Sequence, residues 1–289
     1  MGSPDSLRRF GQVFDDVADA YDEARPGYPE ALVDAAIERG GLSAGSRVLE
    51  VGCGTGKLTE LLSGRGLIVD AVDPGPNMIE AARRRIGGAG TVRFHVARFE
   101  DVSLSAAPFA ALFSATAFHW IEPAVAWRKA AASLEPGGLL ALLTHIGLHD
   151  ERSAETEKAF RANLRRHAPE VADGLPAPRD LETIRAGIEE RRRNASDVWD
   201  WIMGQGAHAL AVEEAAGLFD AVDTQLLVVR TERTADQFIA RLRTTSLYFR
   251  IDPARREAFE DDDRRLVEHL GGTVVWPEAA VLMTARRVV

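Results

Sequence analysis

Residues 48–56 read Val-Leu-Glu-Val-Gly-Cys-Gly-Thr-Gly, an apolar run followed by three glycines at alternate positions. An apolar strand that ends in a glycine turn and continues into a helix is typical of open α/β sheets, which bind ligands at the carboxyl ends of their strands. Glycine accepts positive φ and lets the backbone approach a ligand closely. The first N–H groups of the following helix lack partners within that helix. We therefore expect a ligand site at this turn.

Short apolar runs alternate with segments of helical period throughout residues 47–145. Continuous apolar strands separated by helices predict a parallel sheet that is covered on both faces. The expected fold class is therefore α/β with a doubly wound sheet. The expected strands are 47–51, 67–73, 92–96, 110–114 and 138–145, and the expected helices are 56–63, 78–86 and 122–134.

Further segments flank this alternating region. Two helices are expected before it, and a mostly charged stretch of helical period follows it. The expected flanking elements are helices over 14–24, 29–39, 235–248 and 253–270, and strands over 225–231 and 280–286. We expect three parts, which are a helical cap over 1–40, a core over 41–146 and 221–289, and an inserted helical lid over 147–220 that carries specificity.

The composition excludes several classes of protein. The 289 residues carry a net charge of −9, which disfavours nucleic acid and acidic membranes as partners. The single cysteine, Cys53, excludes an internal disulfide and a cysteine-based zinc site, and we expect no metal. No apolar run approaches the ~20 residues that cross a bilayer, and the start of the chain lacks a signal-peptide pattern. We expect a cytoplasmic monomer or homodimer.

The spacing of the glycines discriminates between ligand classes. A phosphate-binding loop needs glycine where Val51 stands and Ser or Thr where Leu58 stands. A dinucleotide fingerprint needs its third glycine where Lys57 stands, although Asp73 matches the acid that binds the ribose. The first class is excluded, and a nicotinamide-dependent oxidoreductase stays open as an alternative.

The pattern Glu50-x-Gly52-x-Gly54-x-Gly56, with Asp73 ending the second strand, resembles the class I S-adenosylmethionine-dependent methyltransferases of the type 11 kind. This resemblance implies a seven-stranded Rossmann-like sheet and S-adenosyl-L-methionine as cofactor, with S-adenosyl-L-homocysteine as product. Asp73 would accept hydrogen bonds from both ribose hydroxyls, as in dinucleotide sites, or it would cap the next helix. Glu50 would face the methionine ammonium or orient the turn itself.

Other segments extend the resemblance to the adenine side of the cofactor site. Residues 73–83 are similar to the family's segment after the acid, which places Met78 near the adenine or in the core. Gly75 stands where the family more often has Ser. Residues 97–101 resemble the adenine-recognition segment, with Phe99 and Glu100 as candidate contacts, and Ser114 ends the fourth strand.

Two segments resemble the branch of small-molecule methyltransferases that includes the trans-aconitate-type enzymes. The first is Phe14-x6-Tyr21-x3-Arg25-Pro26-x-Tyr28-Pro29, and the second covers 114–120. In that branch the amino-terminal helix folds over the cofactor, so Arg25 would pair with the cofactor carboxylate and Tyr21 would hydrogen-bond nearby. A guanidinium suits a carboxylate because it donates two parallel hydrogen bonds.

The acceptor side of the expected site centres on His119. A neutral imidazole there would take the proton of a substrate hydroxyl or amine, or it would only cap a turn. Phe118 and Trp120 would shape the acceptor pocket, and Trp199 would line it from the lid or belong to the core. We expect methyl transfer to a small-molecule acceptor through an O, N or C nucleophile. A nicotinamide-dependent oxidoreductase and a catalytically silent S-adenosylmethionine-binding protein are the alternatives.

Overall fold

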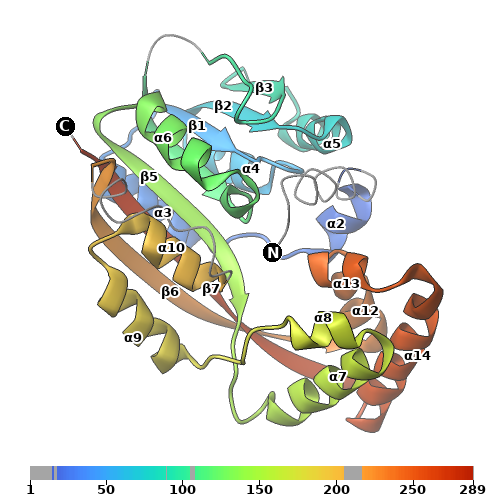
Figure 1. Cartoon of the computed structure of the whole chain (residues 1–289). Coiled ribbons are helices and arrows are strands. Elements are labelled where there is room, and N and C mark those ends of the chain that lie inside the picture. The colour runs from blue at the N-terminus through green and yellow to red at the C-terminus, as the bar shows by residue number, and fades with distance from the viewer. Residues whose placement is uncertain (1–14, 16–17, 89, 105–107, 205–216, 289) are drawn as a thin grey trace.

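The computed structural model describes residues 15, 18–88, 90–104, 108–204 and 217–288. Its centre is one seven-stranded sheet with the order β3-β2-β1-β4-β5-β7-β6 (Figure 1). The strands β1 to β5 pair in parallel, whereas β7 is antiparallel to both β5 and β6. The α/β class expected from the sequence is confirmed. The strands are β1 Arg47–Val51, β2 Ile68–Asp73, β3 Val92–Val96, β4 Phe109–Ala115, β5 Leu134–Gly147, β6 Phe219–Thr234 and β7 Thr273–Arg287.

Helices cover both faces of the sheet, as the apolar strands require. One apolar cluster joins one face to α3, α4 and α5, and a second joins the other face to α6, α9 and α10. Successive residues of β5 alternate between the two clusters, with Leu140 and Leu142 on one side and Leu139 and Leu143 on the other. These helices are α3 Glu30–Gly40, α4 Lys57–Gly64, α5 Pro76–Ile86, α6 Pro123–Ser133, α9 Leu181–Arg191 and α10 Ala195–Met203.

A third apolar cluster lies at the end of the long β6–β7 hairpin, among helices that Figure 1 shows gathered together. They are α7 Ala154–His167, α8 Pro169–Asp173, α12 Ala235–Arg243, α13 Ser246–Arg250 and α14 Pro253–His269. The described helices of the expected lid segment 147–220 belong to two different clusters. Its first helices join this third cluster, whereas α9 and α10 pack on the sheet.

Some element boundaries differ from the sequence expectation. The helix expected over 235–248 is two helices, because Thr245 accepts a hydrogen bond from the Tyr248 N–H and caps the start of α13. The last strand begins at Thr273 and pairs with β6 along the whole hairpin, from Thr273 opposite Thr234. Of the helix expected from residue 14, the structure gives α2 Ala18–Ala24; residues 1–14 of the expected cap lie outside the described part. No described helix is long and apolar enough to cross a membrane.

Candidate functional site

The glycine turn joins β1 to α4 with three positive φ angles, +70° at Gly52, +52° at Gly54 and +84° at Gly56. A Cβ on Gly52 would lie 2.1 Å from the Cβ of Ala117, and one on Gly56 would lie 3.0 Å from the Cβ of Ala82. A Cβ on Gly54 would meet nothing within 4 Å. The outer glycines are therefore required by packing, and the middle one leaves space where a ligand can approach the backbone.

Asp73 ends β2 beside this open space. Its carboxylate accepts hydrogen bonds from the N–H of Gly54 at 2.9 Å and from the N–H of Gly75 at 2.8 Å. Burial raises the pKa of Asp73 to about 6 against the lowering effect of these two bonds. Each oxygen keeps a further lone pair, so Asp73 contacts the residue before α5 and faces the glycine turn at the same time.

Glu50 lies beneath the turn and is almost fully buried, with 1% of its surface exposed. Its carboxyl group accepts a hydrogen bond of 2.6 Å from the hydroxyl of Thr59 on α4. Burial raises the pKa of Glu50 to about 8, the Thr59 bond opposes this, and the charge of Asp73 adds to it. Glu50 therefore fastens α4 to β1, and an adjacent cation would favour its ionised form.

The amino-terminal helix α2 lies against the glycine turn, as the resemblance implies. Lys57, the first residue of α4, donates hydrogen bonds to the carbonyls of Asp22 at 2.6 Å and Arg25 at 2.5 Å. The Arg25 guanidinium donates to the hydroxyl of Thr244 at 3.0 Å and to its carbonyl at 2.5 Å, and lies 5.2 Å from the Tyr21 ring. Arg25 thus connects the residue that begins α4 with the end of α12, and Tyr21 lies beside its guanidinium.

The expected adenine contacts are placed in different surroundings. Met78 is buried, and its N–H donates to the Asp15 carboxylate at 3.0 Å. The ring of Phe99 lies in the core with Lys129 Nζ 5.4 Å from its centre. Glu100 accepts a hydrogen bond from Arg98. The Phe99 side chain therefore serves packing, which leaves its backbone for a ligand.

Asp15 also explains why residue 75 is glycine here, where the family more often has Ser. A Cβ on Gly75 would lie 2.5 Å from an oxygen of the Asp15 carboxylate. That same oxygen accepts the hydrogen bond from Met78 in the first turn of α5. Asp15 therefore supplies from a distant segment the helix cap that residue 75 does not provide.

The aromatic acceptor residues expected from the sequence do not gather at one site. Phe118 packs edge-on against Trp127 in the core, and Trp199 is buried on α10 against the sheet. His119 is 6% exposed and its ring lies 4.8 Å from that of Trp120. Only these last two remain adjacent at the carboxyl end of β4. Their neighbour Ser114 is buried and donates to the Val51 carbonyl at 2.7 Å, so its hydroxyl joins β4 to β1.

A group of polar residues, of which only Arg25 is a candidate site residue from the sequence, lies at the carboxyl ends of β4 and β5. The Tyr28 hydroxyl lies 2.8 Å from the hydroxyl of Thr116, and its ring is 5.2 Å from that of His145. Burial lowers the pKa of His145 to about 4, so its imidazole is neutral at pH 7. We use the name polar cluster for six residues, Arg25, Tyr28, His145, Arg233, Arg241 and Glu278.

Two signals in the sequence point to part of this polar cluster. His145 ends the fifth strand that the sequence predicts, and Tyr28 belongs to the Arg-Pro-x-Tyr-Pro motif. Thr116 adds a structural signal, because its φ of +54° is rare for a β-branched residue. Backbone strain of this kind concentrates at functional sites.

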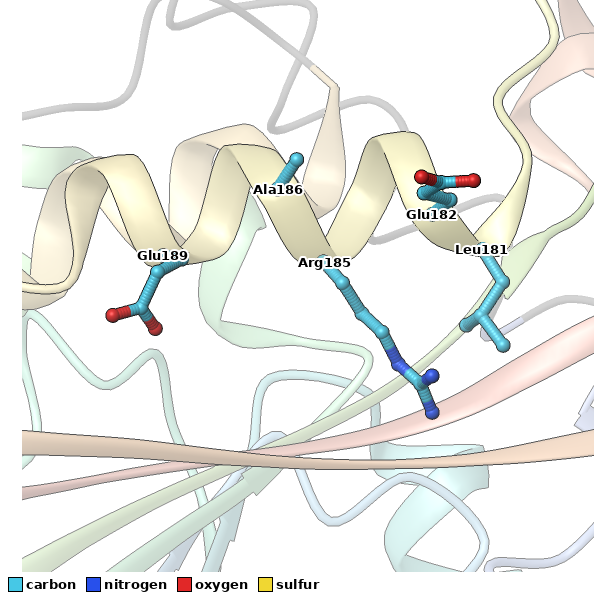
Figure 2. A pocket seen from close by; sticks show the side chains of 5 residues that line it. All are labelled: Leu181, Glu182, Arg185, Ala186 and Glu189. Atoms are coloured by element: carbon cyan, nitrogen blue, oxygen red, sulfur yellow. The ribbon is translucent and has the colours of Figure 1, made fainter.

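A surface hollow elsewhere carries none of these residues. Figure 2 shows side chains of a single helix, α9, around it: Leu181, Glu182, Arg185, Ala186 and Glu189. The hollow has no convergent set of buried polar groups of the kind that binding sites use. The candidate site is therefore the glycine turn together with the polar cluster.

The fold and this site define a class I methyltransferase architecture. Residues 49–142 match the family model described as a methyltransferase domain. An uncharacterised methyltransferase of Mycobacterium tuberculosis is 34% identical over 179 residues, which are 62% of this chain and 70% of that protein. The chain therefore belongs to the methyltransferase family, as the resemblance predicted.

Two further comparisons agree with the branch and the fold. A trans-aconitate 2-methyltransferase of Rhizobium leguminosarum is 30% identical over 139 residues, which are 46% of this chain and 53% of that protein. The solved structure of a putative type II methyltransferase from Anaeromyxobacter dehalogenans superposes with a TM-score of 0.58 at 20% identity. That match covers 91% of this chain and 97% of the other, and it shows the shared fold.

Proposed function

We propose that this chain transfers the methyl group of S-adenosylmethionine to a small-molecule acceptor. The observation that carries the proposal is the arrangement of Gly54 and Asp73. The open space over Gly54 admits a ligand to the backbone, and the Asp73 carboxylate beside it has lone pairs for two hydroxyl donors. These residues fit the ribose of the cofactor, and Tyr21 on α2 and Arg25 directly after α2 would close over its methionine tail.

When bound, S-adenosylmethionine supplies an electrophilic methyl group on a positively charged sulfur. The chain must then align the acceptor nucleophile with the methyl carbon and exclude water, which is enough to account for a large rate increase. Asp73, Arg25 and Tyr21 would hold the cofactor, and the methyl group would pass to the acceptor with the electron pair of the carbon–sulfur bond left on sulfur. His119 is the candidate to receive the acceptor's proton, since it lies buried beside Trp120 at the ligand edge.

The sheet order weakens the nicotinamide alternative. Dinucleotide-binding sheets of the Rossmann type have the strand order 3-2-1-4-5-6. Here β7 is inserted between β5 and β6 and runs antiparallel to both. Lys57 at the position of the third fingerprint glycine agrees with this conclusion, and the net charge of −9 supports a small molecule rather than nucleic acid as acceptor.

Calorimetric titration of the purified protein with S-adenosylmethionine tests the donor site. We expect micromolar binding, and at least tenfold weaker binding for Asp73→Asn and Gly54→Ala. Gly87→Ala is the matched control, because Gly87 also has positive φ, +64°, and open space around its Cβ, but caps the far end of α5. Equal losses for Gly54→Ala and Gly87→Ala would assign the effect to backbone strain and count against the site.

Two further measurements separate the alternatives. Tighter binding of NAD or NADP than of S-adenosylmethionine would overturn the methyltransferase proposal. A protein that binds S-adenosylmethionine but forms no S-adenosylhomocysteine with any member of an acceptor library would favour the catalytically silent alternative. Formation of S-adenosylhomocysteine above the acceptor-free rate would support transfer.

A further inference from the structure

The polar cluster lies on the face of the sheet that α3 covers. It is at the edge formed by the carboxyl ends of the parallel strands, which we call the ligand edge. His145 on β5 is paired with Ala280 on β7, and Glu278 is paired with Gly147 two positions further along. Side chains two positions apart lie on the same face of a strand, so His145 and Glu278 project from the same side. The preceding pair on that side, Leu143 and Leu282, belongs to the apolar cluster under α3. The cluster thus continues the core outward to the edge where open α/β sheets bind ligands.

Glu278 is shared between two arginines. Its Oε1 accepts a hydrogen bond from Arg241 Nη2 at 2.7 Å, and its Oε2 accepts one from Arg233 Nη2 at 3.1 Å. Burial raises the pKa of Glu278, but the charges of Arg241 and Arg233 outweigh this and lower it overall. Glu278 is therefore ionised and pairs with both arginines.

The polar cluster carries more positive than negative charge. Arg25 is a third cation, and its hydrogen bonds in the structure go to uncharged oxygens of Thr244. Burial lowers the pKa of Arg25 to about 10. The positive charge of Arg241 contributes to that lowering, so the two guanidiniums repel each other electrostatically. His145 adds no charge, since burial keeps it neutral. Buried charge is costly unless it is paired. The polar cluster has three guanidiniums and one carboxylate, so an anionic ligand would pair the excess positive charge.

The Arg241 guanidinium has hydrogen-bond donors available for a ligand. Its side chain is 15% exposed, and its Nη2 is bonded to Glu278. Its Nε and Nη1 are buried and have no hydrogen-bond partner among the residues that the structure describes. Leaving such donors of a charged group unsatisfied costs more than leaving neutral ones. An anionic oxygen brought by a ligand would satisfy them.

We propose that Arg241 determines specificity by binding a carboxylate of the acceptor, and that Glu278 holds its guanidinium in place. This rests on the proposed function, in which Arg25 takes the carboxylate of the cofactor. One excess cation then remains for the acceptor, which fits a singly charged carboxylate better than a doubly charged phosphate. Tyr28 and His145 would border this subsite as uncharged partners.

The test is a binding measurement that does not require the acceptor to be known. The probes are acetate, succinate and benzoate, each titrated into the protein saturated with S-adenosylhomocysteine. The corresponding neutral amides serve as ligand controls. We expect at least one carboxylate to bind, its amide to bind at least tenfold more weakly, and Arg241→Gln to lose at least tenfold in carboxylate affinity.

Two further variants distinguish a loss of carboxylate binding from a general disturbance of the structure. Arg241→Lys can keep the ion pair with Glu278 but has a single nitrogen, so we expect it to fold and still lose carboxylate binding. Arg243→Gln removes an arginine two positions along the chain whose partner is Glu260, and whose side chain is 56% exposed. We expect Arg243→Gln to bind carboxylate as the unaltered protein does.

The outcomes are distinguishable. Binding of no carboxylate, equal binding of the amides, or unchanged affinity in both Arg241 variants would overturn the proposal. Loss of S-adenosylhomocysteine affinity in Arg241→Gln with carboxylate binding intact would assign Arg241 to the cofactor and also overturn it. If the unaltered protein bound no S-adenosylhomocysteine, the proposed function would fail, and titration of the carboxylates into the free protein would still test Arg241.

Discussion

Tyr28 and Thr116 are 88 positions apart in the chain, and their hydroxyl groups lie 2.8 Å apart. This hydrogen bond fastens the segment after α2 to the end of β4, where Thr116 has its positive φ. The residue before Thr116 ends β4, and the following Ala117 packs against Gly52 of the glycine turn. One contact therefore links the amino-terminal segment, the cofactor turn and the ligand edge of the sheet.

A double-mutant cycle on this pair should show strong coupling. Tyr28→Phe and Thr116→Val each remove one hydroxyl, keep the shape of the side chain and leave the other hydroxyl without its partner. We expect each change to lower the free energy of unfolding by about 1–3 kcal/mol, with a coupling energy of about 0.5–3 kcal/mol. Urea denaturation of the four proteins measures it. Additive effects would mean that the two hydroxyls act independently.

The two outer positions of the glycine turn should respond to substitution differently from the middle one. Gly52→Ala places a Cβ against Ala117 at a positive φ, so we expect it to cost well over about 2 kcal/mol of stability. Gly54→Ala meets open space and should cost only the backbone strain of about 1–2 kcal/mol. Thermal denaturation of both variants, compared with Gly87→Ala, checks this. A Gly52→Ala protein as stable as Gly54→Ala would contradict the packing requirement.

Asp263 on α14 should make stability depend on pH. It is fully buried and bonded to Asn163 Nδ2 at 2.7 Å, and burial raises its pKa to about 7. Because the folded-state pKa exceeds the unfolded value, its contribution to stability is complete below about pH 4 and is lost as pH rises through 7. Unsatisfied oxygens on both residues fit a protonated Asp263 that donates to Asn163.

Asp263→Asn isolates this effect from other titrating groups. The amide also donates to Asn163 but does not ionise, so the variant should gain stability relative to the unaltered protein as pH rises from 4 to 7. The expected gain approaches about 1.4 kcal/mol per pH unit. Denaturation curves for both proteins across this range give the difference. A difference that does not change with pH would exclude Asp263 as the titrating group.

The sequence predicted those parts of the fold that depend on local pattern. The first strand, the three glycines, the helix that follows them and the acid at the end of β2 lie within 27 residues, at positions 47–73, and the structure keeps them together. The amino-terminal helix was placed through the family resemblance, and α2 does lie against the turn.

The polar cluster could not be predicted in the same way. Arg25 and Thr244 are 219 positions apart, and Glu278 reads in the sequence as an ordinary charged residue of a strand. Its burial follows from pairing with two arginines that only the fold brings near. Phe118 and Trp199 were expected at the acceptor pocket but lie in the core. An aromatic residue in a core and one in a pocket give the same sequence pattern, so the sequence could not distinguish them.

Glu50 offers a test of the predicted contact with the methionine ammonium. Its pKa of about 8 means that most Glu50 carboxyls are protonated at pH 7 in the free protein. A cation bound beside it favours the charged form. Binding of S-adenosylmethionine at pH 7 should therefore release on the order of one proton per site. Titration calorimetry in phosphate and in Tris, whose ionisation enthalpies differ, measures the number.

The pH dependence separates Glu50 from Asp73. Asp73, with a pKa of about 6, is already mostly ionised at pH 7 and contributes little to the release. At pH 8 half of the Glu50 carboxyls are ionised before binding, so the release should fall to about half. In Glu50→Gln it should nearly vanish, while the side-chain carbonyl still accepts the Thr59 hydrogen bond. Proton release that persists in Glu50→Gln would place the methionine ammonium away from Glu50.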